Sequence, residues 1–143
     1  MRPIVCATRG GEVSRRTQER AVALAKERDT ELIFLCVVDP GFAGPVDKAL
    51  TATLADELQW LGRALLSVAQ ARAREQGVVA RTAVRCGPAW QNIEEYVRRV
   101  DADALVIGAP RTGSTPRALG SGNVHRLAET INEATGVEVV VVT

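Results

Sequence analysis

Apolar positions along this chain fall into five short runs, and longer amphipathic segments separate them. The runs, each typical of a β-strand, are residues 3–8, 31–38, 78–85, 104–107 and 137–142. The segments between them carry apolar residues at helical spacing and predict helices over 12–28, about 47–76, 88–100 and 124–131. Strands that alternate with helices predict right-handed crossovers, and therefore a doubly wound parallel sheet in a single α/β domain spanning 1–143.

The longest expected helix carries a persistent apolar stripe. Its members recur every three or four residues, which is typical of the side of a helix that faces a core: Leu50, Leu54, Leu58, Leu61, Leu65 and Val68. We also expect Trp60 and Trp90 to pack beside apolar helix faces. At the helix starts, Ser14 is a candidate N-cap and Pro88 a candidate first helical residue.

Composition narrows the class of protein. Apolar residues make up 46% of the 143 residues and aromatic residues only 3%, so aliphatic side chains must build the core. A net charge of +1 argues against a nucleic-acid-binding protein, and no apolar run approaches the roughly 18 residues of a membrane span. The chain shows no signal-peptide pattern, and Cys6 and Cys36 lie inside apolar strands, so we expect buried, reduced thiols in a cytoplasmic protein.

The strongest candidate for chemistry follows the fourth apolar run. That run enters a loop containing Gly108, Gly113, Gly120 and Gly122, and a helix begins directly afterwards at Val124. Glycines allow backbone N–H groups to approach a phosphate, and a helix N-terminus offers unsatisfied donors. Strand, glycine-rich loop and helix in this order therefore predict an anion site.

A second glycine-containing loop, Thr8-Arg-Gly-Gly11, follows the first strand. Ligands of doubly wound sheets bind beyond the carboxyl ends of the strands, where the strand order reverses. If the first and fourth strands are neighbours, the two loops face each other across that crevice. Arg111, Arg117 and Arg126 would then supply positive charge for an anion.

In the order of these elements the chain resembles the universal stress protein family. The resemblance rests on Thr8-Arg-Gly-Gly-Glu-Val-Ser14, Cys36-Val-Val-Asp39, Gly87-Pro88, Ala102-Asp-Ala-Leu-Val-Ile-Gly108 and the valine-rich terminal strand. It implies a five-stranded sheet of order 3-2-1-4-5 with helices on both faces, as in the adenine nucleotide alpha hydrolase-like fold. It also implies a homodimer, in a family with one branch that binds ATP or AMP and another that does not.

This chain departs from the nucleotide-binding branch at two positions. That branch ends its first strand with an Asp where this chain has Arg9, and its loop motif Gly-x2-Gly-x9-Gly-(Ser/Thr/Asn) has Arg111 here in place of the second glycine. Gly108 matches the first glycine. The last pair is matched either by Gly122-Asn123 with one inserted residue or by Gly120-Ser121 with one deleted residue. The candidate nucleotide or anion site comprises Thr8, Arg9, Gly10, Val38, Gly108, Arg111, Gly113, Arg117, Gly120, Ser121, Gly122 and Asn123.

Several of these residues admit a second interpretation. The segment 120–123 either binds phosphate or only caps the last helix, and Arg9 either contacts phosphate or pairs with Asp39. His125, the one histidine, fits a surface residue better than a catalyst, because no Asp or Ser partner is evident. The chain contains no phosphate-binding loop with lysine, no nucleophile elbow and no metal-spaced His/Cys cluster, so we expect neither a catalytic residue nor a metal. A ligand-free interaction module, and more remotely a slow nucleotide hydrolase, are the alternatives.

The terminal strand also predicts an assembly. In the implied order it lies at the edge of the sheet, where an open apolar strand is a template for another chain. We expect Val139, Val140, Val141 and Val142 to pair antiparallel with a second copy across a two-fold axis. The alternative is an edge that neighbouring helices half cover.

Overall fold

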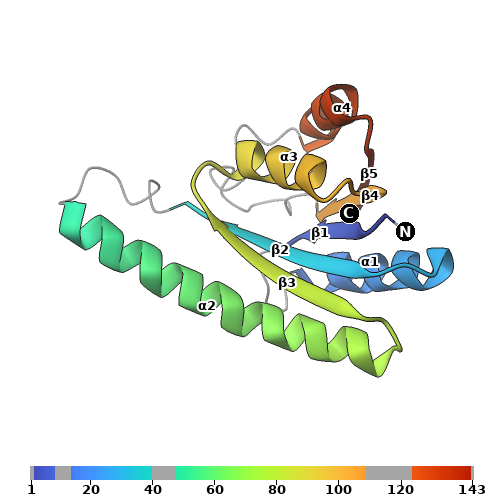
Figure 1. The fold of residues 1–143 in the computed structure, drawn as a ribbon, viewed down its shortest axis with the longest axis horizontal. Helices are drawn as coiled ribbons and strands as arrows, with labels where there is room; N and C mark the ends of the chain where they lie inside the picture. Colours follow the sequence, from blue (N-terminus) through green and yellow to red (C-terminus); the bar gives the residue numbers. More distant parts are fainter. Residues whose placement is uncertain (1, 9–13, 40–47, 109–123, 143) are drawn as a thin grey trace.

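The computed structural model describes residues 2–8, 14–39, 48–108 and 124–142. Its strands are β1 (Ile4–Ala7), β2 (Leu32–Val38), β3 (Ala80–Cys86), β4 (Ala104–Gly108) and β5 (Glu138–Val142). Its helices are α1 (Arg15–Arg28), α2 (Lys48–Glu75), α3 (Ala89–Arg99) and α4 (Val124–Thr135). Figure 1 shows these strands and helices alternating along the chain, as the apolar pattern predicts.

The five strands form one parallel sheet of order β3-β2-β1-β4-β5, which confirms the expected topology. The central strand β1 pairs on one side with β2, where Ile4 lies opposite Leu32, and on the other with β4, where Ile4 lies opposite Ala104. The strand order reverses between β1 and β4. The crevice that doubly wound sheets use for ligands therefore lies at the carboxyl ends of these two strands.

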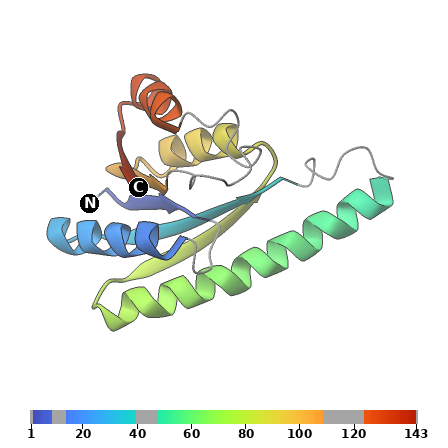
Figure 2. The ribbon, with the colours of Figure 1, turned by 180° about the vertical axis from the view of Figure 1, so that it is seen from behind.

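Helices α1 and α2 cover one face of the sheet, and α3 and α4 cover the other (Figures 1 and 2). Alternate residues of β2 divide between the two cores: Phe34 packs with α1 and α2, whereas Ile33 and Leu35 pack with α3 and α4. All three side chains are buried, as the continuous apolar run predicts for a strand covered on both sides. Within the described residues, no helix combines the length and apolar character needed to cross a membrane.

The α2 stripe faces the sheet only in part, because Leu54, Leu58 and Leu65 are half-buried whereas its other three residues are exposed. Leu50, Leu61 and Val68 are 59%, 48% and 50% exposed. The buried side of α2 instead contains small residues with one leucine between them: Gly62, Leu66, Ala69 and Ala73. Small side chains let the helix backbone approach β2 and β3 closely, since a Cβ built on Gly62 would lie 3.4 Å from the Sγ of Cys36.

Three smaller expectations about the helices have different outcomes. Trp60 is 67% exposed, so its expected packing role is wrong, whereas Trp90 packs against the core under α3 and α4. Ser14 makes no side-chain capping bond, because its backbone (φ −93°, ψ 0°) already continues the helical turn. Pro88 is the N-cap of α3 rather than its first helical residue, with an extended ψ of 128°.

Candidate functional site

The carboxyl ends of β1 and β4 lie side by side at the centre of the sheet. The register that pairs Cys6 with Val106 brings Thr8, directly after β1, level with Gly108, the last residue of β4. Crossover helices run opposite to the strands, so α1 and α4 begin at this same end of the sheet. Two adjacent strand ends and two helix N-termini therefore meet where the strand order reverses.

Thr8 is fixed by two hydrogen bonds, although it is a polar residue that is only 7% exposed. Its backbone N–H donates to the carbonyl oxygen of Leu35 over 2.8 Å. Its hydroxyl Oγ1 accepts from Nε2 of Gln18, on the first turn of α1, over 3.1 Å. The Gln18 amide thus fixes the buried hydroxyl of Thr8 against α1.

Gly108 lies against the same turn of α1. A Cβ built on Gly108 would lie 2.6 Å from Oγ1 of Thr17, a distance that real side chains do not adopt. Thr17 and Gln18 are 7% and 5% exposed, so neither can swing into solvent without opening the structure. Packing alone therefore requires glycine at the end of β4, whether or not a ligand binds there.

Cys6 lies beneath this turn, in the middle of β1. Its thiol donates a weak hydrogen bond to the carbonyl oxygen of Thr17, with 4.0 Å between sulfur and oxygen. Burial raises the pKa of the Cys6 thiol well above its ordinary value, because the thiolate would be unsolvated. The buried thiol is therefore a packing group, as expected from its place in an apolar strand.

Val38 ends β2, the next strand in the sheet. Its carbonyl oxygen accepts from the backbone N–H of Gly87 over 2.8 Å. Gly87 has a φ of +132°, which side-chain-bearing residues rarely adopt, and its turn connects β3 to α3. Val38, Thr8 and Gly108 thus end three neighbouring strands.

The structure brings together the three predicted site residues that it describes. The remaining predicted residues lie outside the described residues: Arg9, Gly10, Arg111, Gly113, Arg117, Gly120, Ser121, Gly122 and Asn123. Thr17 and Gln18 were not predicted. They could have been found, because they continue the buried face of Ala21, Leu24 and Ala25 by one helical turn and are polar where that face is otherwise apolar.

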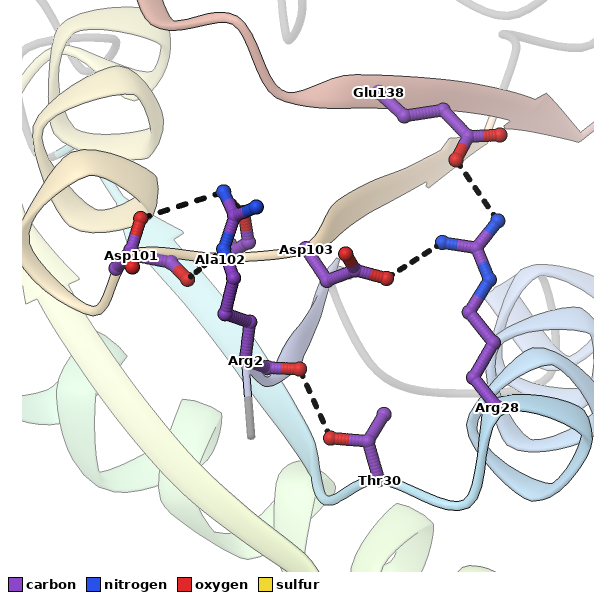
Figure 3. Close-up of polar contacts among 7 residues, drawn as sticks. All are labelled: Arg2, Arg28, Thr30, Asp101, Ala102, Asp103 and Glu138. Carbon is purple, nitrogen blue, oxygen red and sulfur yellow. Dashed lines mark hydrogen bonds and ion pairs between the residues drawn. The ribbon is translucent and has the colours of Figure 1, made fainter.

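The opposite, amino end of the sheet has a different character, shown in Figure 3. The guanidinium group of Arg28 donates to Asp103 over 2.7 Å and to Glu138 over 2.8 Å. Beside it, Arg2 pairs with Asp101 over 3.3 Å and donates to the Ala102 carbonyl oxygen. These charges are satisfied by one another, so they join α1 to β4 and β5 and offer no ligand a vacant counter-charge.

Within the described ranges, no group of three or more His, Cys, Asp or Glu side chains is placed to hold a metal ion. His125 is exposed on α4, in agreement with its interpretation as a surface residue.

Comparison with known proteins agrees with this architecture. A curated relative, universal stress protein MJ0531 of Methanocaldococcus jannaschii, is 31% identical over 120 residues, covering 82% of this chain and 71% of the relative.

Two solved structures also share the fold. A universal stress protein in complex with cAMP has a TM-score of 0.70 at 24% identity and covers 99% of this chain and 97% of its own. The universal stress protein of Archaeoglobus fulgidus in complex with dAMP has a TM-score of 0.66 at 20% identity and covers 100% and 98%. These likenesses confirm the adenine nucleotide alpha hydrolase-like fold. The model of the universal stress protein family matches residues 1–142, and this chain belongs to that family.

Proposed function

We propose that this protein is a regulatory, stress-response domain that binds an adenine nucleotide, such as ATP or AMP, or another phosphate-bearing anion. The observation that carries the proposal is the meeting of Thr8 and Gly108 with the N-termini of α1 and α4 where the strand order reverses. Two proteins of the same fold are described in complex with cAMP and dAMP, which supports the same class of ligand here. We also propose a cytoplasmic location, because Cys6 and Cys36 are buried thiols on the apolar strands β1 and β2, as is typical of proteins in reducing compartments.

The ligand is held chiefly through its phosphates. Backbone N–H groups of Gly113 and of 120–123 contact the phosphate oxygens, and Arg111 and Arg117 add positive charge. The acidic residue that contacts adenosine in the nucleotide-binding branch is replaced by Arg9 in this chain. Recognition of the phosphates is therefore stronger than recognition of the nucleoside.

Calorimetric titration with ATP tests this site. Gly122→Val adds a side chain where the backbone must approach the phosphates, and Arg117→Glu repels the anion, so both variants should lose ATP affinity. Arg74→Glu makes the same charge change at the carboxyl end of α2, which lies at the amino end of the sheet, and should leave affinity unchanged. Equal ATP affinity in the native protein and in both loop variants would exclude the phosphate site.

The second candidate function is a ligand-free interaction module with a vestigial nucleotide site. Arg9 and Arg111 favour it, because they replace motif residues and two arginine side chains in the crevice would exclude adenosine. Mass spectrometry of the purified protein separates the candidates. A nucleotide that co-purifies supports the first candidate, and a protein that neither carries nor binds nucleotides supports the second.

We further propose that the protein is a homodimer paired through Val139–Val142 of β5. The two edges of the sheet differ in a way that supports this choice. On β3, the carbonyl oxygen of Val79 accepts from Leu32 and the N–H of Gly87 donates to Val38, so odd-numbered residues face β2. The carbonyl oxygens of the even-numbered residues therefore point to the open edge: Ala80, Thr82, Val84 and Cys86.

Side chains protect two of these open carbonyl oxygens. Nε2 of Gln70 donates to the carbonyl oxygen of Ala80 over 2.8 Å, and Arg85 donates to that of Val84 over 3.0 Å. Within the described ranges, no side chain makes such a bond to the backbone of Glu138–Val142. An unprotected strand of four half-buried valines is the edge better suited to pair with a second copy.

Proline substitution tests the dimer. Val140→Pro and Val141→Pro each remove one backbone N–H group from β5. Because successive residues direct their N–H groups to opposite sides of a strand, one of the two groups points toward the partner. Thr82→Pro is the matched control, since its N–H points to the open edge of β3. Light scattering should report the same mass for the native protein and the control, at least that of a dimer, and a lower mass for both β5 variants. A native monomer at micromolar concentration would exclude the β5 dimer.

A further inference from the structure

The side of α2 that faces away from the sheet carries a row of mostly apolar side chains, which belongs neither to the core nor to the candidate site. Seven residues along it alternate spacings of four and three, which is the a and d pattern of a coiled-coil seam. We call this set the α2 seam: Leu50, Leu54, Glu57, Leu61, Ala64, Val68 and Ala71. It spans 22 residues, or about 33 Å of helix.

The α2 seam points away from the sheet. The buried side of the helix is that of Leu66, Ala69 and Ala73, whereas every residue of the seam except the half-buried Leu54 is exposed. Four of the five exposed large hydrophobic side chains in the described residues lie on α2. Such concentration of exposed apolar surface on one element indicates an interaction surface.

Two copies of the α2 seam match each other in side-chain size only when the helices run antiparallel. Leucines occupy the amino-terminal half and alanines the carboxyl-terminal half. In an antiparallel pair of α2 helices, Leu54 lies opposite Ala71 of the second copy and Leu61 opposite Ala64. A parallel pair would instead stack each leucine on itself and leave alanine facing alanine, which packs unevenly.

Charge selects the same direction. The one charged residue of the seam is Glu57, and a parallel pair would bring the two Glu57 carboxylates face to face. In the antiparallel pair Glu57 lies opposite Val68, and the two Glu57 carboxylates are separated by 11 residues along the helix axis, or about 16 Å.

We propose that α2 pairs antiparallel with α2 of a second copy of this chain, about a two-fold axis between Gly62 and Arg63. The contact lies over β2 and β3, apart from the β5 edge, so the two interfaces can form together. One chain with two different two-fold contacts assembles beyond a dimer.

Cysteine cross-linking in a Cys86→Ser background tests the direction of the pair. Leu54→Cys and Ala71→Cys are prepared separately, mixed and mildly oxidised. In the antiparallel pair, Cys at position 54 of one variant lies opposite Cys at position 71 of the other, so only the mixture should yield cross-linked dimer. Two copies of the same variant would hold their cysteines 17 residues apart along the helix axis, or about 25 Å. Cross-linking of each variant with itself, or none in the mixture, would overturn the proposal.

A charge in the seam tests whether the contact forms in solution. Leu61→Glu should raise the dissociation constant of the α2 contact at least about a hundredfold, because it places a carboxylate in an apolar layer of each chain. Val79→Glu is the matched control, since Val79 is 75% exposed and lies outside the seam. Analytical ultracentrifugation should show Leu61→Glu, but not Val79→Glu, with half the native mass. Identical masses for Leu61→Glu and the native protein would contradict the α2 contact even if the β5 dimer persists.

Discussion

The two ends of the parallel sheet use polar residues for opposite purposes. At the amino end, Arg28 bridges Asp103 and Glu138 on the surface, and each charge has its partner within the cluster. At the carboxyl end, Thr8 and Gln18 are neutral, buried and joined by one hydrogen bond. The amino end joins elements together, whereas the carboxyl end fixes the backbone where two strands finish.

This difference indicates where a ligand can bind without reorganising the protein. A phosphate at the amino end would have to displace an acidic group from Arg28. At the carboxyl end, Gly108 has no side chain to move, and the helix N-termini supply donors. Variants at the carboxyl end should therefore change both stability and ATP affinity, and variants at the amino end only stability.

The largest effect is expected at Gly108. Gly108→Ala forces a Cβ against Oγ1 of Thr17 and should lower the free energy of unfolding by about 1–3 kcal/mol. Gly62→Ala is the control. The new Cβ would lie 3.4 Å from Sγ of Cys36, and alanine favours a helix more than glycine does, so the loss of unfolding free energy should be much smaller. Urea denaturation measures both variants.

A second substitution identifies the cause of that loss. Adding Thr17→Ala to Gly108→Ala removes the clashing hydroxyl, and the remaining contact with Cβ of residue 17 is an ordinary 3.7 Å. The double variant should recover most of the stability lost by Gly108→Ala. Equal losses in Gly108→Ala and Gly62→Ala would show that the close approach of α1 to β4 is wrong.

An intermediate effect is expected at Gln18. Gln18→Leu keeps the volume but removes the donor to the buried hydroxyl of Thr8, which should cost about 1–2 kcal/mol in thermal or urea unfolding. Combining it with Thr8→Val replaces both partners by apolar groups, so the double variant should lose less than the sum of the single losses. Strictly additive losses would mean that the two side chains are not coupled.

The smallest effect is expected at Arg28. Arg28→Met removes both ion pairs, yet all three side chains are partly exposed and screened, so the loss should be only about 0.5–1 kcal/mol and should shrink with added salt. ATP affinity should stay within about twofold of the native value, because distant sites act independently. A clear loss of ATP affinity would remove the distinction between the two ends of the sheet.

The sequence predicted the fold well because its signals are local and repeated. Short continuous apolar runs such as 31–38 are typical of strands buried on both faces, and their alternation with helices leaves few topologies. The face of α2 could not be predicted in the same way. Its leucines form the more regular stripe, but the sheet selects the side with Gly62, Ala69 and Ala73, because close approach depends on small side chains rather than on hydrophobicity.

The candidate site was predictable in part. Thr8, Val38 and Gly108 follow strands, so the topology alone brings them to one edge. Gln18 lies ten residues after Thr8 in the chain, and only the packing of α1 on β1 shows that their side chains meet. Such a contact depends on how α1 is rotated about its own axis. The apolar periodicity of the sequence indicates which face of the helix is buried, but not which individual side chains meet.

Calorimetric titration of the native protein with ATP and with GTP tests the central claim most directly. If the carboxyl end of the sheet holds nucleotides through their phosphates, both should bind, with affinities within about an order of magnitude, or a gap of about 1.4 kcal/mol. Binding of neither nucleotide, or a strong preference for ATP over GTP, would contradict a site that recognises phosphate rather than base.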